Sequence, residues 1–130
     1  MNHPVACAAA LKNIAILEQE HLIERAAEIG MYFLDALESL KEHTIVAEVR
    51  GRGLWLGIDF TLDRKTRAVF PVGRLNRLVQ RAQSKGLIIK FMGHAVELAP
   101  PLVITRDEIH KGVEILHKCI AEEAKEAPLA

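Results

Sequence analysis

Apolar residues recur every three or four positions along much of this chain, which is the spacing of one face of an α-helix. The pattern predicts helices over residues 6–19, 21–40 and 73–85. A fourth helix begins at a capping box formed by Thr105 and Glu108, in which each side chain satisfies a backbone N–H group of the first turn. The break between the first two helices is weak, so one long bent helix is an alternative.

Four apolar runs bounded by glycines or polar residues predict β-strands, and they cover residues 45–50, 54–61, 87–92 and 95–98. The run at 54–58 is almost wholly apolar, so we expect it to be covered on both faces or nearly so. The charged stretch 62–71 is predicted to be a solvated loop. Strands joined by short turns pair antiparallel. The sequence therefore predicts an α+β fold: a small antiparallel sheet with helices packed on one face, preceded by a long N-terminal helical segment.

The composition indicates one folded domain and disfavours several kinds of partner. Half of the 130 residues are hydrophobic, 26% are charged, and the formal net charge is zero. Nucleic-acid-binding proteins usually carry a basic excess, so we expect no nucleic-acid partner. No apolar run approaches the roughly 20 residues of a membrane span, so no membrane partner is expected either. Cys7 and Cys119 are far apart and are expected to be reduced core residues of helices in an intracellular, cytoplasmic protein.

The residues that carry chemistry form no catalytic pattern in the sequence. No nucleophile stands beside a base, and the histidines show no metal-ligand spacing. His110 and His117 are seven residues apart, which puts them near one helix face, and a surface position is the favoured interpretation. Asn2 is a candidate N-cap for the first helix. Gly30 lies inside the second helix and costs about 1 kcal/mol relative to alanine, unless a neighbour needs the space.

Three motifs occur in order along the chain: His3–Leu11 (HPVACAAAL), Glu48–Leu54 (EVRGRGL) and Leu98–Thr105 (LAPPLVIT). Together they resemble the C-terminal part of class III aminotransferases, pyridoxal-phosphate enzymes that move amino groups at ω-carbons or on simple amines. The resemblance covers about residues 2–124. It implies the small domain of a fold type I pyridoxal-phosphate enzyme. Residues 1–20 would then belong to the helix that links to a missing large domain, 21–124 to the C-terminal small domain and 125–130 to a tail.

The same resemblance implies that the catalytic machinery lies outside this chain. In the family, the lysine that forms a Schiff base with the cofactor belongs to the large domain. We therefore expect no catalytic residue here, pyridoxal 5'-phosphate in the full-length enzyme but none bound to this fragment, and no turnover by the fragment alone. The implied partners are the large domain of the same polypeptide, a second subunit in a homodimer, and small amine and 2-oxo acid substrates.

Three residues are candidates for substrate binding. Glu97 stands where ornithine-type members carry an arginine that grips the substrate α-carboxylate, and a carboxylate cannot do this. Lys90 stands where amine:pyruvate members carry a mobile arginine, and it keeps the positive charge without the forked geometry. A solvated strand lysine without a substrate role is the alternative. Arg50 is the third candidate, although a structural pairing beside the glycine turn is favoured. Trp55 is expected on the buried sheet or at the contact with the large domain.

The function that this resemblance implies is the substrate-recognising lid domain of a class III transaminase. The enzyme would move an amino group from an ω-amino acid or amine to a 2-oxo acid such as pyruvate. The alternative is a stand-alone α+β binding or oligomerisation module without catalysis. If the chain is part of a larger enzyme, an exposed apolar face is expected, chiefly within residues 5–20.

Overall fold

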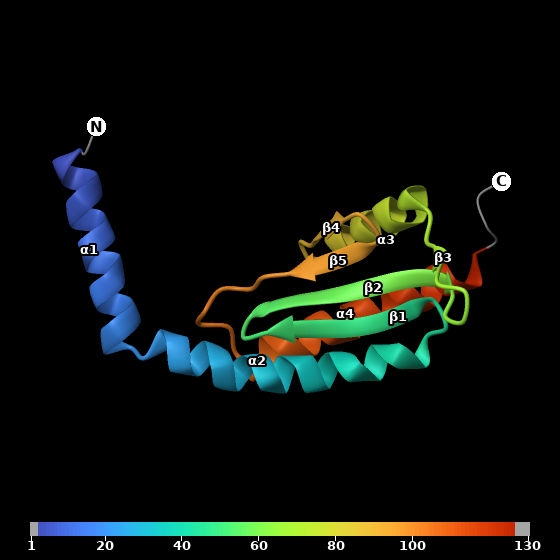
Figure 1. Cartoon of the computed structure of the whole chain (residues 1–130), viewed down its shortest axis with the longest axis horizontal. Helices are drawn as coiled ribbons and strands as arrows, with labels where there is room; N and C mark the ends of the chain where they lie inside the picture. Colours follow the sequence, from blue (N-terminus) through green and yellow to red (C-terminus); the bar gives the residue numbers. More distant parts are fainter. Residues whose placement is uncertain (1–2, 127–130) are drawn as a thin grey trace.

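The computed structural model describes residues 3–126, and Figure 1 shows its arrangement. The elements are α1 (Pro4–Gln19), α2 (Leu22–Glu38), the 3-10 helix η1 (Ser39–Glu42), β1 (Val46–Arg52), β2 (Trp55–Asp63), β3 (Ala68–Val69), α3 (Val72–Ser84), β4 (Lys90–Met92), β5 (Ala95–Leu98) and α4 (Arg106–Lys125). The candidate cap Asn2 and most of the expected tail lie outside the described residues. None of the helices between residues 3 and 126 has the length and apolar character needed to cross a membrane.

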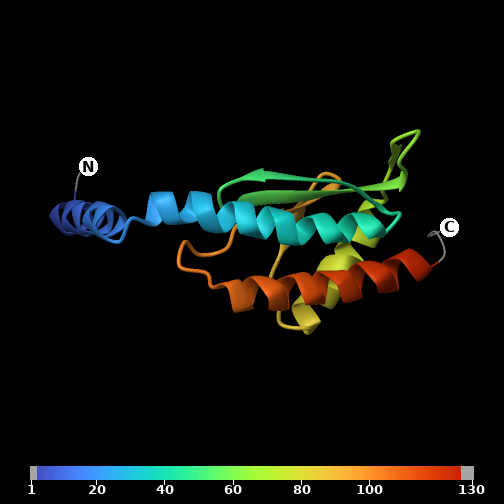
Figure 2. The same ribbon diagram turned by 90° about the horizontal axis from the view of Figure 1, so that it is seen from below.

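The sheet is antiparallel throughout, in the order β1-β2-β5-β4, and β3 pairs with the end of β2. Helices α2, α3 and α4 lie on one side of it (Figure 2), which confirms the α+β class and the one-sided packing. The expectation that 54–58 is covered on both faces is wrong, because Trp55 is 70% exposed on the open face. The predicted loop 62–71 also contains the short strand β3, whose partner in β2 supplies the pairing that local sequence does not encode.

One apolar layer between the sheet and the helices forms the core. Alternate residues of each strand face this layer because side chains of a strand point to opposite faces in turn. Its most deeply buried members include Leu37 and Leu40 from α2 and η1, Leu56 and Ile58 from β2, Leu75 and Leu78 from α3, and Leu116 and Ile120 from α4. The periodicities read from the sequence therefore identify the buried stripes of α2, α3 and α4.

Helix α1 stands apart from this core and projects away from the sheet in both views (Figures 1 and 2). It buries no residue, and Val5 and Leu11 are among its exposed apolar side chains. The expectation that Cys7 is a core residue is wrong: Cys7 is exposed because its helix has no neighbour along that face, whereas Cys119 is buried. His21, with a left-handed φ of 50°, separates α1 from α2, so the two helices are not one continuous helix.

Gly30 is required by a backbone-to-backbone contact. A Cβ atom at Gly30 would lie 2.2 Å from the carbonyl oxygen of Gly53, in the turn between β1 and β2. Gly53 itself has φ 55°, a conformation that favours glycine. Backbone atoms cannot swing aside as a long side chain can, so this contact excludes any side chain at position 30. The neighbour that needs the space is therefore the β1–β2 turn.

Gly30→Ala is expected to lower the free energy of unfolding by about 3 kcal/mol, because the added methyl group forces α2 and the β1–β2 turn apart. Gly112→Ala is the matched control. It lies in α4, and its Cβ would meet only Leu87 Cδ1, at 3.8 Å. This control should gain up to about 1 kcal/mol from helix propensity. Urea denaturation of both variants measures the difference, and equal effects would contradict the contact.

A buried ion-pair cluster joins α3 to α4. Glu123 is fully buried, and its carboxylate receives Arg74 Nε at 2.7 Å, Arg77 Nη2 at 2.8 Å and Arg81 Nη1 at 2.9 Å. The guanidinium group of Arg74 also lies over the Phe70 ring, 4.8 Å from its centre. Burial acts to raise the pKa of Glu123, but the hydrogen bonds and charges of Arg77 and Arg74 outweigh it, so the pKa lies below its usual value.

Glu123→Gln is expected to cost about 3 kcal/mol at neutral pH, because buried Arg74 loses its counter-charge. A carboxylate with a lowered folded-state pKa stabilises the fold above its unfolded pKa, and this contribution disappears as the pH falls through the folded pKa. The wild-type protein should therefore lose stability below about pH 4.3, more steeply than the variant. Urea denaturation at a series of pH values measures this, with the exposed Glu114→Gln on the same helix as control.

Candidate functional site

The three predicted site residues lie in one row across the open face of the sheet. Arg50 of β1 pairs with Gly57 of β2, Gly57 with Glu97 of β5, and Glu97 with Lys90 of β4. Residues directly opposite one another in paired strands project from the same face. The structure therefore brings Arg50, Glu97 and Lys90 together on the side of the sheet that carries no helix.

Glu97 is the centre of this row. Lys90 Nζ lies 2.9 Å from Glu97 Oε2, and Trp55 Nε1 donates a hydrogen bond of 2.6 Å to Glu97 Oε1. Oε2 is buried, and the Lys90 ammonium group is the cation paired with it. Hydrogen bonding to the ammonium group of Lys90 and to the indole N–H of Trp55 holds the pKa of Glu97 below its usual value, so its carboxylate is ionised at neutral pH.

Arg50 is held at the other end of the row. Its guanidinium group forks onto the carboxylate of Asp59, with Nη1 on Oδ2 and Nη2 at 3.1 Å from Oδ1. Asp59 is buried on the sheet, so this two-pronged bond fixes Arg50 firmly. The structure thus gives Arg50 the structural pairing favoured from the sequence, although its side chain remains 55% exposed, compared with 69% for Lys90.

A groove of about 460 Å³ runs over Arg50, Gly57 and Glu97 of this row, with Trp55 and Met92 also in its walls. Gly57 forms its floor. A Cβ atom at Gly57 would meet only the carbonyl oxygen of Val96, at 3.9 Å, so the backbone does not require glycine there. The missing side chain instead keeps the groove open, and the groove can take a small molecule that carries both charged and apolar parts.

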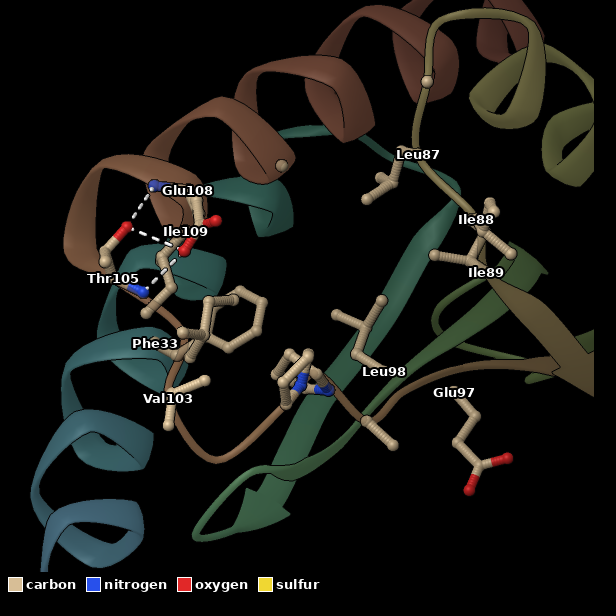
Figure 3. A pocket seen from close by; sticks show the side chains of 16 residues that line it. Phe33, Leu87, Ile88, Ile89, Glu97, Leu98, Val103, Thr105, Glu108 and Ile109 are labelled. Carbon is tan, nitrogen blue, oxygen red and sulfur yellow. Dashed lines mark hydrogen bonds between the residues drawn. The ribbon is translucent and has the colours of Figure 1, made fainter. Parts of the chain in front are cut away.

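A cavity of about 620 Å³ lies on the opposite side of the sheet (Figure 3). Apolar side chains such as Phe33, Leu98 and Ile109 line it, while the Glu97 carboxylate points away from it. Glu108 lies at its edge, but the backbone N–H and the hydroxyl of Thr105 bind its carboxylate, and these bonds lower its pKa. Because the Glu108 carboxylate is occupied as part of the helix cap, it is not available for acid–base chemistry in this cavity. The remaining lining suits an apolar occupant.

The family model for class III aminotransferases matches residues 1–120, and the chain belongs to this family. An aminotransferase of Schizosaccharomyces pombe is 40% identical over 137 aligned residues, which cover 97% of this chain and 30% of that protein. The putrescine–pyruvate aminotransferase of Pseudomonas aeruginosa is 36% identical over 126 residues, covering 94% of this chain and 27% of the relative.

Solved transaminase structures share this fold over a similar fraction of their length. A pyridoxal-phosphate-bound amine transaminase from an uncultivated Pseudomonas species superposes with a TM-score of 0.88 at 36% identity, covering 92% of this chain and 28% of that one. The chain thus spans roughly 25–30% of the length of the relatives that it matches. The expected membership of class III is confirmed.

The described residues do not by themselves form a pyridoxal-phosphate site. Such a site needs a lysine amine enclosed in a pocket. Every lysine between residues 3 and 126 is exposed except Lys41, which is half-buried and pairs with Glu38 at 2.6 Å. The lysines among the described residues thus offer no enclosed amine to a cofactor.

The sequence analysis missed three members of the site: Gly57, Asp59 and Trp55 as a partner of Glu97. The missing information is the pairing of β2 with β5, which brings together residues about forty positions apart. Of the two positions expected for Trp55, burial on the sheet is wrong because its side chain is 70% exposed, and a contact with the large domain stays a prediction. The only local signal was Gly57 in an otherwise apolar strand, since glycine weakens a strand interior unless space is needed.

Trp55 is the only tryptophan in the chain, so its fluorescence reports on Glu97 directly. Protonating Glu97 removes the charged acceptor of the indole N–H group, and the emission should change with a midpoint below the usual glutamate pKa. Glu97→Gln should abolish this step, and Lys90→Met should raise its midpoint, because the lysine charge favours the ionised form. Circular dichroism over the same pH range controls for unfolding. An unchanged midpoint in Lys90→Met would contradict the ion pair.

Proposed function

We propose that this chain is the substrate-recognising C-terminal domain of a class III transaminase that moves an amino group from an ω-amino acid or amine to a 2-oxo acid such as pyruvate. The exposed Lys90 is the observation on which this rests: its side chain is 69% exposed and lies 2.9 Å from the carboxylate of Glu97, which lines the groove. The ammonium group can leave Glu97 for a substrate carboxylate, because an exposed ion pair contributes little stability.

Glu97 gives the proposed site its preference. A fixed, ionised carboxylate repels the α-carboxylate of an amino-acid donor that lies close to it, so donors such as ornithine are disfavoured in that orientation. A donor that presents an amine or ammonium group meets no such repulsion. The name of the putrescine–pyruvate relative, which pairs a diamine with pyruvate, is consistent with this proposal.

The proposed partner of α1 is the large domain of the same enzyme. Helix α1 buries nothing within the described chain and exposes Val5, Leu11 and Ile14. Its separation from α2 at His21 agrees with residues 1–20 as the link to that domain, and 21–124 as the small domain. The large domain would supply the pyridoxal-phosphate lysine, and a second subunit would complete a homodimer. A cytoplasmic location stays a prediction from the sequence.

Lys90→Ala in the intact enzyme that contains this chain should raise the KM for pyruvate about ten-fold, because the oxo-acid carboxylate loses a charge-assisted hydrogen bond. The kcat should change less, since the lysine is not part of the chemical step. Lys118→Ala on α4 is the control, an exposed lysine away from the row. Glu97→Gln should lower the same KM, because it removes the carboxylate that competes for Lys90. An unchanged KM in Lys90→Ala would exclude this role.

A further inference from the structure

His43 and His117 are 74 positions apart in the sequence, and their imidazole rings meet at the surface of α4. His43 follows η1 directly, and His117 lies in α4, which runs alongside α2 and its continuation (Figure 2). The His43 Nε2 atom is 3.0 Å from His117 Nδ1. Glu42 Oε1 lies 3.2 Å from His117 Nδ1 and 3.6 Å from His43 Nε2. Three donor atoms of types that bind metals therefore form one small triangle.

The hydrogen bonds around this triangle fix the tautomer of His117. The Ser39 hydroxyl donates its only proton to the carbonyl oxygen of Ala36, at 2.7 Å. Its oxygen must therefore accept from His117 Nε2, at 2.9 Å. In neutral His117 the proton then lies on Nε2, and Nδ1 presents its lone pair to the triangle. In metal sites, the imidazole nitrogen that does not bind the metal commonly donates its N–H to a protein acceptor, and this hydrogen bond orients the ring.

We propose that Glu42, His43 and His117 bind one divalent late transition-metal ion, with Zn²⁺ as the reference ion. Two ligands around zinc at 2.0–2.1 Å in tetrahedral geometry are roughly 3.3 Å apart, and the three separations in the triangle lie around that value. Two imidazole nitrogens and one carboxylate oxygen suit zinc, whereas magnesium and calcium prefer oxygen ligands alone. The fourth position is open, and the ion links η1 to α4.

The state of His43 agrees with this assignment. Burial and the neighbouring His117 lower the pKa of His43, and the opposing effect of Glu42 is smaller. A neutral imidazole is the form that binds a metal ion. No local pattern indicates the site, because His43 and His117 show no ligand spacing along the chain and only the packing of η1 on α4 brings them together.

The test is a Zn²⁺ titration of the protein by calorimetry, after chelation and without a polyhistidine tag. Exposed Cys7 lies one helical turn after His3, so a Cys7→Ser background removes that competing pair. One Zn²⁺ should bind per chain and raise the Tm. His43→Gln and His117→Gln should each weaken binding more than about 100-fold, and Ser39→Ala about ten-fold through the orientation of His117. Circular dichroism checks that each variant is folded.

His110→Gln is the matched control, on the same helix but hydrogen-bonded to Tyr32 rather than to the triangle. It should bind Zn²⁺ as the parent does, and excess Mg²⁺ or Ca²⁺ should not displace the ion. The proposal is overturned if the parent takes up no stoichiometric Zn²⁺, or if His110→Gln loses as much affinity as His117→Gln. Transaminase activity does not enter this test, so its outcome is independent of the proposed function.

Discussion

The contact of α2 with the β1–β2 turn sets the spacing between the helices and the sheet. Two glycines meet there backbone to backbone, Gly30 from the helix and Gly53 from the turn. With the helix this close, Phe33 and Leu37 reach the inner side of β1 and β2 and join the apolar core. This contact holds the inner face of the sheet against α2. It therefore also sets the position, relative to the helices, of the charged row on the outer face of the sheet.

Two glutamates show how the same residue type serves two purposes in one domain. Glu123 is enclosed by three arginines between α3 and α4, and its charge is satisfied on every side. Glu97 has one tight neutral donor, Trp55, and one exposed cation, Lys90. The first arrangement is rigid because any loss leaves a buried charge. The second is adaptable because Lys90 can exchange partners at the surface.

Local sequence predicted the elements well and the site only through resemblance. The apolar periodicity identified α2, α3 and α4, and the Thr105–Glu108 capping box begins α4 where expected. Local patterns do not contain the register between β2 and β5, which aligns Arg50, Glu97 and Lys90. They also gave no warning that Trp55 faces outward or that Cys7 is exposed, since burial depends on which neighbours a face meets.

The left-handed residue between α1 and α2 has a mechanical consequence. A histidine with φ 50° carries about 1 kcal/mol of backbone strain, and moving it to right-handed angles would relieve that strain and turn α1 relative to α2. The direction of α1 is therefore governed by the torsions of Glu20 and His21, which separate the two helices. A small backbone rotation at this joint displaces the N-terminal end of α1 by many times the movement at the joint itself. A partner that binds α1 can therefore reorient the rest of the domain by changing the backbone angles around His21.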